Sequence, residues 1–238
     1  MLDTFAERVK TLQTVTEYQH FMAEELGKLG FDYFAYLSFD TPYPQKSARV
    51  ILNYPFEWIR RYAEQDYYRF DPILDEATWT LEAFNWVGLR DRGQMSEQQT
   101  RVMDEGGDFG LCEGMAIPIH KPDGGMAILS VSARMSRKAF EELSATHAMT
   151  VHAMALHYHV ALSTAIERGD VSCQTLTMME REVLVHSASE RDEWTISEIL
   201  HIPRVQVERH LRSAMKKLGV CSRQHAVVQA VANRLIEP

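Results

Sequence analysis

Several features of common protein classes are missing from this 238-residue chain. The three cysteines, Cys112, Cys173 and Cys221, have neither metal-ligand nor redox spacing, which is typical of free thiols in a reducing compartment. No apolar run reaches the length of about eighteen residues that a membrane-spanning helix needs. The N-terminal segment, MLDTFAERVK, lacks the basic flank and apolar block of a signal peptide. These absences predict a cytoplasmic protein without a membrane partner.

Catalytic and metal-binding motifs are missing as well. Four histidines lie close together in the sequence: His147, His152, His157 and His159. On a helix, successive members of this set would point about 140° to 200° apart, so no chelating i, i+4 pair forms. We expect these histidines at the edge of the core or in a subunit interface. No His/Cys or Ser/His/Asp set follows a nucleophile-elbow motif, and the GDFG and DGG stretches are not phosphate loops. The sequence therefore predicts no metal site, no cofactor and no enzymatic activity.

What the chain does have is an uneven distribution of charge. Its formal net charge is -8, from 25 basic and 33 acidic residues. Residues 171–238 contain nine Lys/Arg and eight Asp/Glu, a net charge of +1, which leaves -9 on the remainder. With 45% apolar residues, both parts can bury a core. An acidic body with a near-neutral tail invites a search for a local basic stripe in the tail.

The first part of the chain shows helical and extended patterns in turn. The opening segment has apolar residues at helical spacing as far as Gly30. Residues 31–39 and 50–54, which are rich in aromatic and β-branched side chains, predict strands. Pro55 suits the start of a short helix, because its fixed φ fits there and its missing N–H would be unpaired anyway.

A hairpin and a long helix complete this part. Residues 115–120 and 126–133 are extended runs separated by KPDGG, whose Pro, Asp and Gly are typical of a turn. Residues 140–167 have the length and apolar spacing of one long helix. Strands between helices at both ends predict an α/β/α sandwich for residues 1–165.

The tail has a different pattern. Residues 166–174 are short, polar and irregular, and we expect them to form a linker. Beyond them T-M-M-E at Thr177 predicts a capping box, and T-I-S-E at Thr195 gives a second helix start. H-I-P-R at His201 is a tight connection, and two helices joined by so short a turn are typical of a helix-turn-helix. The tail, 175–238, is thus predicted to be an all-α, four-helix helix-turn-helix domain, which makes the whole chain α+β.

The third helix of the tail is the most basic in the chain. Its predicted buried stripe recurs at i, i+4, i+8 and i+11 and consists of Val207, Leu211, Met215 and Leu218. Off that stripe lie one acid and five basic residues: Glu208, Arg204, Arg209, Arg212, Lys216 and Lys217. Such a face can neutralise phosphates and place side chains against base edges. A charged face that only meets solvent is the alternative, and the helix pair in front of it favours DNA.

The tail resembles the C-terminal DNA-binding domain of the LuxR family of quorum-sensing transcription factors. The resemblance covers nearly all of residues 175–235 and rests on Leu176-Thr177, Glu180, Val183-Leu184, Glu198-Ile199, Ile202, Val207, His210-Leu211, Ala214-Met215, Lys217-Leu218-Gly219-Val220, Arg223 and Ala226. It implies DNA contacts from the third helix through Arg204, Gln206, Glu208, Arg209, Arg212, Lys216 and Lys217. Arg212 falls where relatives place a base-reading Arg.

The chain departs from the family pattern at three points. Relatives usually carry a Gly where this chain has Glu190, and the stretch SERDEW predicts a loop about three residues longer, up to Trp194. Gln206-Val207-Glu208 stands in place of Thr-Val-Lys/Arg. A carboxylate cannot bind phosphate, so Glu208 either accepts from cytosine N4 and changes the operator that is read, or weakens binding.

An aromatic stretch in the first part raises a separate question. Residues 53–72 hold one Trp, four Tyr and two Phe, and they end in Asp71-Pro72. Trp58 and Tyr62 are four residues apart and share one helix face. An aromatic core with an exposed Asp at a turn is one interpretation. A buried Asp71 needs a hydrogen-bond donor, because an unpaired buried carboxylate costs several kcal/mol or becomes protonated.

This part resembles the acyl-homoserine lactone-binding domain of the same family. The resemblance covers residues 15–165 and rests on Tyr54, Trp58, Tyr62, Asp71-Pro72, Trp86, Gly110, Gly114 and Pro118. It implies that Trp58 donates to a lactone carbonyl and that Asp71 accepts from an amide N–H which the protein does not supply. Tyr54 and Ser130 are then expected to hold the acyl carbonyl. The division fits the chemistry, since indole only donates and an ionised carboxylate only accepts.

The walls of such a pocket are expected from Tyr36, Tyr62, Trp86, Leu111 and Ile128. Ser130 lies mid-strand, and the alternative is that it faces solvent or bonds to backbone. Ala116, where some relatives carry a Thr, removes one polar anchor. Chain length and the 3-substituent of a ligand depend on wall volumes and stay open.

Together the resemblances imply a transcriptional regulator gated by a buried N-acyl-homoserine lactone. We expect a homodimer on double-stranded DNA with a near-palindromic site, with RNA polymerase as a further candidate partner. The helix near residues 138–165 and the last helix, 222–236, are predicted to supply the dimer contacts. Three alternatives stay open: a regulator that is independent of or inhibited by ligand, a lactone-processing enzyme, and a tail that serves only as a protein-interaction module.

Overall fold

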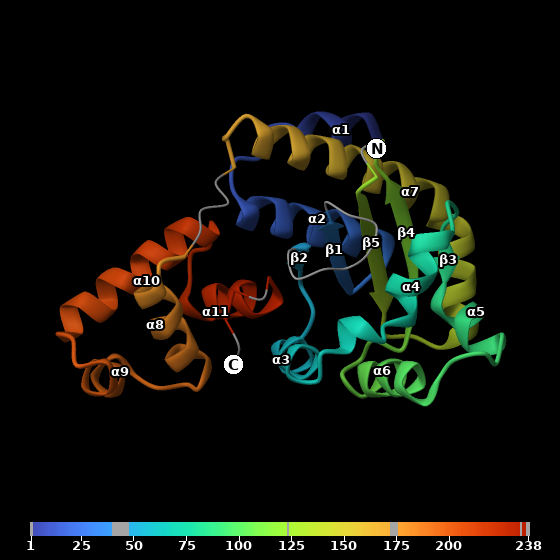
Figure 1. The fold of residues 1–238 in the computed structure, drawn as a ribbon. Helices are drawn as coiled ribbons and strands as arrows, with labels where there is room; N and C mark the ends of the chain where they lie inside the picture. Colours follow the sequence, from blue (N-terminus) through green and yellow to red (C-terminus); the bar gives the residue numbers. More distant parts are fainter. Residues whose placement is uncertain (1, 40–47, 123, 172–175, 234, 237–238) are drawn as a thin grey trace.

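The computed structural model describes residues 2–39, 48–122, 124–171, 176–233 and 235–236. Its N-terminal part contains α1 (Leu2–Val9), α2 (Val15–Leu29), β1 (Tyr33–Phe39), β2 (Ala48–Leu52), α3 (Phe56–Glu64), the 3-10 helix η1 (Tyr67–Arg69), α4 (Pro72–Trp79), β3 (Phe84–Asn85), α5 (Trp86–Asp91), α6 (Glu97–Asp108), β4 (Glu113–His120), β5 (Met126–Ala133) and α7 (Arg137–Glu167). Its C-terminal part contains α8 (Met178–Ala188), α9 (Glu193–Leu200), α10 (Arg204–Leu218) and α11 (Arg223–Ala232). Figure 1 shows the two parts side by side, with α11 nearest to β2 and α3. The described helices nowhere combine the length and apolar character that crossing a membrane requires.

The first predicted helix is two helices, α1 and α2. The break follows from a capping box that the apolar spacing concealed: the Thr14 side chain accepts from Glu17 N, and the Glu17 side chain accepts from Thr14 N. The end at Gly30 is confirmed, because Gly30 adopts a left-handed φ of 100° and donates to the last carbonyls of α2. α1 is thereby free to turn and pack against α7.

A five-stranded antiparallel sheet in the order β2-β1-β5-β4-β3 forms the centre of the N-terminal part. β4 and β5 form the predicted hairpin, in which Ile117 pairs with Leu129 and Lys121 N donates to Gly125 O at 2.8 Å. Every residue of β5 is buried, which is typical of a central strand covered on both faces.

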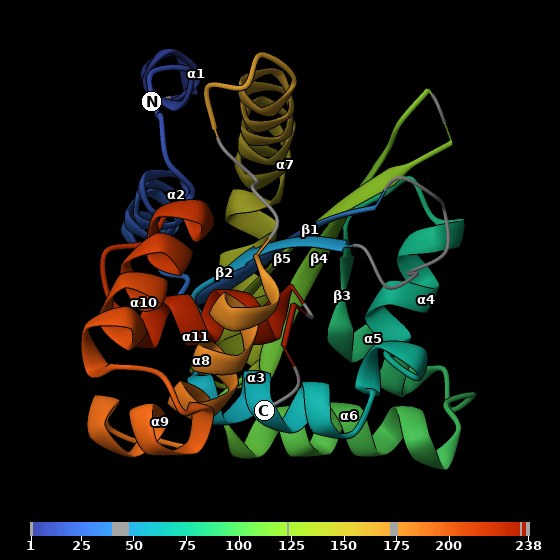
Figure 2. The ribbon, with the colours of Figure 1, turned by 60° about the vertical axis from the view of Figure 1, so that its left-hand side comes forward.

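Helices cover both faces of this sheet, so the predicted α/β/α sandwich is confirmed (Figures 1 and 2). On one face α1, α2 and α7 bury Phe21 and Tyr158 against Leu129 of β5. On the other face α4 packs Leu74 against Ile128, the neighbouring residue of the same strand. Burying these side chains contributes about 1.5–3 kcal/mol each.

The C-terminal part is the predicted four-helix domain. Val207, Leu211 and Leu218 of α10 are buried as expected, but the fourth buried position is Ala214, and Met215 is only partly buried. They pack with apolar residues of α8, α9 and α11. The turn between α9 and α10 is closed by His201, a C-cap with a left-handed φ of 52°.

The predicted start of α9 was wrong. α9 begins at Glu193 because Asp192 is its N-cap and accepts from Thr195 N at 2.8 Å. The connection from α8 is therefore only residues 189–192, and Trp194 lies in the first turn of the helix.

Parts of two predicted connections lie outside the described residues, namely 40–47 of the polar loop after β1 and 172–174 of the linker. α7 continues through Glu167, so the first two residues predicted as linker are helical. Cys112 and Cys221 are exposed free thiols, and Cys173 lies outside the described residues.

Glu180 anchors the C-terminal domain. Its buried carboxylate accepts from Thr177 N, Ser213 Oγ and Lys217 Nζ, each at 2.7 Å. Burial alone raises the pKa of Glu180, but these three donors and the Lys217 charge lower it to about 2. Because the folded pKa lies below the unfolded one, this stabilisation is present above about pH 4.5 and is lost as pH falls towards 2.

We therefore expect Glu180→Gln to lower the free energy of unfolding by roughly 3 kcal/mol at pH 7 and by much less near pH 3. Urea denaturation at the two pH values measures both. An equal loss at both would contradict the ionic role of this carboxylate.

Glu190 adopts a left-handed backbone conformation with φ of 57° at the end of α8. A side chain in this region costs about 1–2 kcal/mol, a cost that Gly does not have. We expect Glu190→Gly to raise the free energy of unfolding by about 0.5–1 kcal/mol, and Glu190→Ala to give no gain. Thermal scanning of the three proteins tests this; a Gly variant no more stable than the Ala variant would rule out backbone strain.

Candidate ligand pocket and DNA-binding face

A cavity of about 130 Å³ lies between the sheet and α3–α6. Seven of the nine residues predicted to bind ligand line it: Tyr54, Trp58, Tyr62, Asp71, Trp86, Leu111 and Ser130. Most other lining side chains are aliphatic or aromatic. An apolar cavity with a few polar groups is the usual composition of a small-molecule site.

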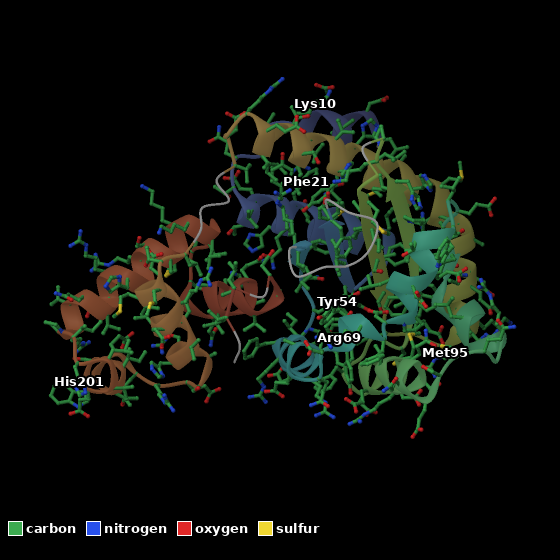
Figure 3. All side chains as sticks on the ribbon, in the orientation of Figure 1. Lys10, Phe21, Tyr54, Arg69, Met95 and His201 are labelled. Carbon is green, nitrogen blue, oxygen red and sulfur yellow. The ribbon has the colours of Figure 1, made fainter. Side chains whose placement is uncertain are left out.

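The helix α3 brings the aromatic residues to the cavity. Pro55 is its N-cap, which leaves Tyr54 just before the first turn, and Figure 3 shows Tyr54 between the sheet and α3. Trp58 and Tyr62 lie one turn apart with ring centroids 5.7 Å from each other at 70°. Tyr67 of η1 contacts both rings: it is edge-to-face with Tyr62 at 84° and tilted against Trp58 at 37°, so the indole and the phenol are held by aromatic packing.

Asp71 begins α4 and already has two donors from the protein. Its Oδ1 accepts from Ile73 N at 2.8 Å as the helix N-cap, and its Oδ2 accepts from the Tyr62 hydroxyl at 2.7 Å. The expectation that the protein supplies no donor to this carboxylate was wrong. Burial raises the pKa of Asp71, and the hydrogen bonds from Tyr62 and Ile73 oppose that rise.

Tyr54 and Trp86 offer further donors. Burial, together with the charge of Asp71, raises the pKa of Tyr54, so its hydroxyl keeps its proton. Within the described residues, Trp86 Nε1 is buried without a hydrogen-bond partner. Its ring lies so close to Gly114 that a Cβ there would come within 2.5 Å of Trp86 Cε2, which explains why glycine suits this position.

Alternation along the strands decides which sheet residues reach the cavity. Ser130 on β5 is 5% exposed and lines it, as predicted. Ile128 is on the same face and packs with Leu74 and Ala116, but it does not itself line the cavity. The prediction of Ile128 as a wall was therefore wrong.

Tyr36 was also placed wrongly in the wall. It pairs with Leu129 in the ladder and faces α7, where its hydroxyl is 2.7 Å from His159 Nδ1 and its ring contacts Tyr158. Its neighbours Ala35 and Leu37 line the cavity instead, because successive strand residues point to opposite faces.

The lining residues that were not predicted include two groups from other parts of the fold. Val102 and Met103 come from α6, whose apolar spacing could have indicated them. Val231, Ala232 and Asn233 come from the end of α11 and its cap, in the C-terminal domain. No local signal in the sequence indicates this second group.

The predicted DNA-binding residues lie on α10. Arg204, Gln206, Arg209, Arg212 and Lys216 are exposed, which leaves their side chains available to a partner. Lys217 is different, because it forms an ion pair with Glu180 at 2.7 Å and its side chain is only 18% exposed. Its position on the α8-facing side of α10 does not fit the predicted phosphate contact.

Glu208 lies between two arginines of this face. Its carboxylate is 3.4 Å from Arg204 Nε and 3.7 Å from Arg212 Nη2, both at i, i+4 spacing. Exposed pairs of this kind contribute little to stability. Their main consequence is that the negative charge of Glu208 partly offsets the positive charges of Arg204 and Arg212.

The histidines of α7 do not form a metal centre. Within the described part of the chain, no group of three or more His, Cys, Asp or Glu residues could hold a metal ion. His159 is buried beside Tyr36, whereas His157 is exposed on the outer side of the helix.

Comparison with known proteins finds two family matches in separate parts of the chain. Residues 14–162 match the autoinducer binding domain, and residues 174–230 match the bacterial regulatory proteins of the luxR family. The chain belongs to the LuxR family. This LuxR-family protein is a quorum-sensing transcriptional regulator with an autoinducer-binding domain and a helix-turn-helix domain. The family is made up of transcriptional regulators and not of enzymes.

Similar proteins cover between 68% and 98% of the LuxR-family chain. It is 27% identical to the transcriptional activator protein BjaR1 of Bradyrhizobium diazoefficiens, over 98% of this chain and 95% of the relative. It is 30% identical to the quorum-sensing-dependent regulator RpaR of Rhodopseudomonas palustris, over 77% and 73%. Escherichia coli SdiA has the same fold, with a TM-score of 0.56 at 19% identity over 98% of this chain and 97% of that one. Burkholderia cenocepacia CepR2 has a TM-score of 0.54 at 19% identity, over 68% and 96%.

Removing the acidic charge from the α10 face should strengthen DNA binding by this LuxR-family protein. We expect Glu208→Gln to raise the affinity for a random-sequence duplex roughly tenfold near 0.1 M salt and to steepen the slope of log K against log salt by about 1–2, because Arg204 and Arg212 become available to phosphates. Fluorescence anisotropy at several salt concentrations measures both quantities.

The exposed Glu182 of α8 gives a matched control. Glu182→Gln makes the same change in net charge away from α10, and we expect it to leave the slope unchanged. If the two variants have the same affinity for DNA and the same salt slope, the inference that Glu208 locally offsets its neighbouring arginines is wrong.

Proposed function

We propose that the autoinducer of this regulator is an N-acyl-homoserine lactone bound in the cavity between the sheet and α3–α6. Trp58 donates to the lactone carbonyl, and Asp71 accepts from the amide N–H. Tyr54 and Ser130 donate to the acyl carbonyl. The observation that carries the proposal is the convergence of these four groups, each with the required donor or acceptor chemistry, on one apolar cavity.

Asp71 has capacity for the ligand amide beside its two protein donors. An ionised carboxylate offers about four lone-pair sites, and Tyr62 and Ile73 N use two of them. An amide N–H from the ligand would favour the ionised form, which burial disfavours. Tyr62 then acts as a positioning residue that holds the carboxylate in one orientation.

The four polar groups come from three elements, which explains how binding could stabilise the domain. Tyr54 and Trp58 belong to α3 and its approach, Asp71 begins α4, and Ser130 lies in β5. A ligand that bridges them ties both helices to the sheet. A ligand of the folded state alone stabilises that state by mass action.

We infer a homodimer that binds a near-palindromic site in double-stranded DNA. α7 supports it, because Met149, Leu156 and Val160 are 85%, 42% and 61% exposed and recur at helical spacing along its outer side. The expected contribution of the last helix is not supported, since α11 packs on α3 and β2 of its own chain. A twofold axis through α7 would present two α10 helices to two half-sites.

RNA polymerase is a further proposed partner, because a transcriptional regulator acts on the enzyme that transcribes the DNA. The cytoplasm is the proposed location, because the regulator must reach both the DNA and that enzyme. The effector lactone is the only small molecule that the proposal requires. The domain limits proposed are 1–165 for ligand binding and dimerisation, 166–174 for the linker and 175–238 for DNA binding.

Thermal scanning with a series of lactones tests the ligand class. At about 100 times the dissociation constant, a bound lactone should raise the unfolding midpoint on the order of 5–10 °C. If no lactone of any acyl chain length shifts the unfolding midpoint, the proposed ligand class is wrong. If a lactone stabilises the protein but DNA affinity is the same with and without it, a ligand-independent regulator is favoured.

Asp71→Asn tests the role of the carboxylate. We expect lactone affinity to fall about 10- to 100-fold, because the charged acceptor is lost. Without lactone, the thermal unfolding midpoint of this variant near pH 7–8 should equal or exceed that of the parent. The raised pKa of Asp71 means that its ionised form is disfavoured in the folded state, and Asn is an adequate N-cap. Asp75→Asn, one turn along α4 and exposed, is the control. Equal affinity of the Asp71 variant and the parent contradicts the assignment.

A further inference from the structure

The cavity has a wall that the ligand-binding domain does not provide. Val231 and Ala232 end α11, Asn233 caps it, and all three line the cavity. Figure 2 shows α11 running beside β2 and α3, so that its last turn lies over the edge of the sheet. The helix-turn-helix domain therefore closes part of the pocket.

Asn233 fixes this wall to the sheet. Its Oδ1 accepts from Val50 N at 2.8 Å, and its Nδ2 donates to Val50 O at 3.2 Å. β2 is the edge strand, so the Asn233 amide takes the place that a peptide group of a neighbouring strand would occupy. The Gln229 carbonyl and side chain accept from the same Nδ2 at 2.8 and 3.0 Å, which orients the amide.

Apolar contacts continue across the same boundary. Val50, Leu52 and Ile59 of the ligand-binding domain belong to one buried cluster with Ala230 and Val231 of α11. Val231 is 1% exposed and Ala230 is fully buried. The end of α11 is thus part of a continuous core rather than a loose cover.

A second contact holds the same domain at α2. The carbonyl of Gly219, after α10, accepts from Thr16 N at 3.3 Å and from the Thr16 hydroxyl. A Cβ on Gly219 would approach Val15 N to 3.3 Å, so the two segments are closely packed. With α2 and β2 both engaged, the end of α11 has a defined position at the cavity.

The two ends of the cavity differ in chemistry. Trp58, Tyr62, Asp71 and Trp86 gather at one end, and aliphatic side chains of β2, α3 and α11 line the other. Tyr54 contacts both groups and lies between them. A ligand whose polar head is held at the first end can extend a saturated chain towards the second.

We propose that Val231 and Ala232 of the DNA-binding domain form the wall against which the end of the acyl chain packs, and thereby determine the accepted chain length. The proposal rests on the lactone function proposed above. A chain that fits leaves Asn233 on Val50 and closes the pocket with α11. A longer chain displaces the end of α11 and breaks both amide hydrogen bonds.

The test compares affinities of the full-length protein for butanoyl, hexanoyl, octanoyl and dodecanoyl homoserine lactones by titration calorimetry. For each variant, the ratio of affinities for a longer and a shorter lactone is used, because a general loss of stability largely cancels in that ratio. We expect Val231→Ala to shift the ratio towards the longer lactone about tenfold, and Ala232→Leu to shift it the other way, since one or two methylenes are worth such factors in a pocket.

Val227→Ala is the matched control, because Val227 is buried in the same helix but does not line the cavity. Its ratio should equal that of the parent. If the parent binds lactones and the Val231 and Ala232 variants keep the control's ratio, the wall assignment is overturned and the proposed function stands. If the parent binds none of the lactones, the proposed function fails, and this inference fails with it.

Hydrogen exchange gives an independent readout. The Val50 amide, which donates to Asn233, should exchange faster in the parent when a chain longer than the preferred one is bound, whereas the Leu129 amide in the centre of the sheet should not change. Val50 protection that is independent of chain length, at saturating lactone, would also overturn the inference.

Discussion

A carboxylate at the start of α4 connects this helix to α3 beside the cavity. Placing an ionised Asp71 away from water costs several kcal/mol unless donors surround it. Ile73 N and the Tyr62 hydroxyl are those donors, so the first turn of α4 and the last turn of α3 must meet at one point. Since Trp58 lies one turn from Tyr62, the same contact sets the orientation of the indole over the cavity. One electrostatic requirement thus positions two helices and three of the residues proposed to bind ligand.

The helical part of this site could be predicted from sequence and the strand part only partly. On α3, four-residue spacing alone places Trp58 and Tyr62 together, and Pro55 marks the start of the helix. On the strands, the period of two is known but its phase is marked only weakly, because β5 is buried on both faces and only Ser130 and Ser132 distinguish one face from the other. Ser130 was assigned to the correct face by its hydroxyl and its family resemblance, whereas Tyr36, aromatic like the true wall, was assigned to the wrong one.

Contacts between residues far apart in sequence account for the remaining errors. Lys217 belongs by composition to the basic face of α10, yet the buried Glu180 on α8 captures it, because an unpaired charge there would cost more than a lost phosphate contact. Asp192 and Thr195 are both capable N-caps, and only the packing of the domain selects the first. Asn233, 183 residues from Val50, carries no local sign that it will join an edge strand.

The ion pairs of Lys217 and Glu208 also leave the DNA-binding surface with little net positive charge. The tail has a net charge of only +1, Lys217 is used internally, and Glu208 offsets Arg204 and Arg212. Few phosphates can therefore be neutralised by one copy, and the affinity of one copy for DNA should be low. In the proposed homodimer, pairing two copies through α7 would double those contacts. Within each chain, α11 meets β2 and α3 beside the cavity, and Asn233 fixes that contact through Val50. Under the proposed function, a change in the pocket wall therefore also acts on the position of the helix-turn-helix domain.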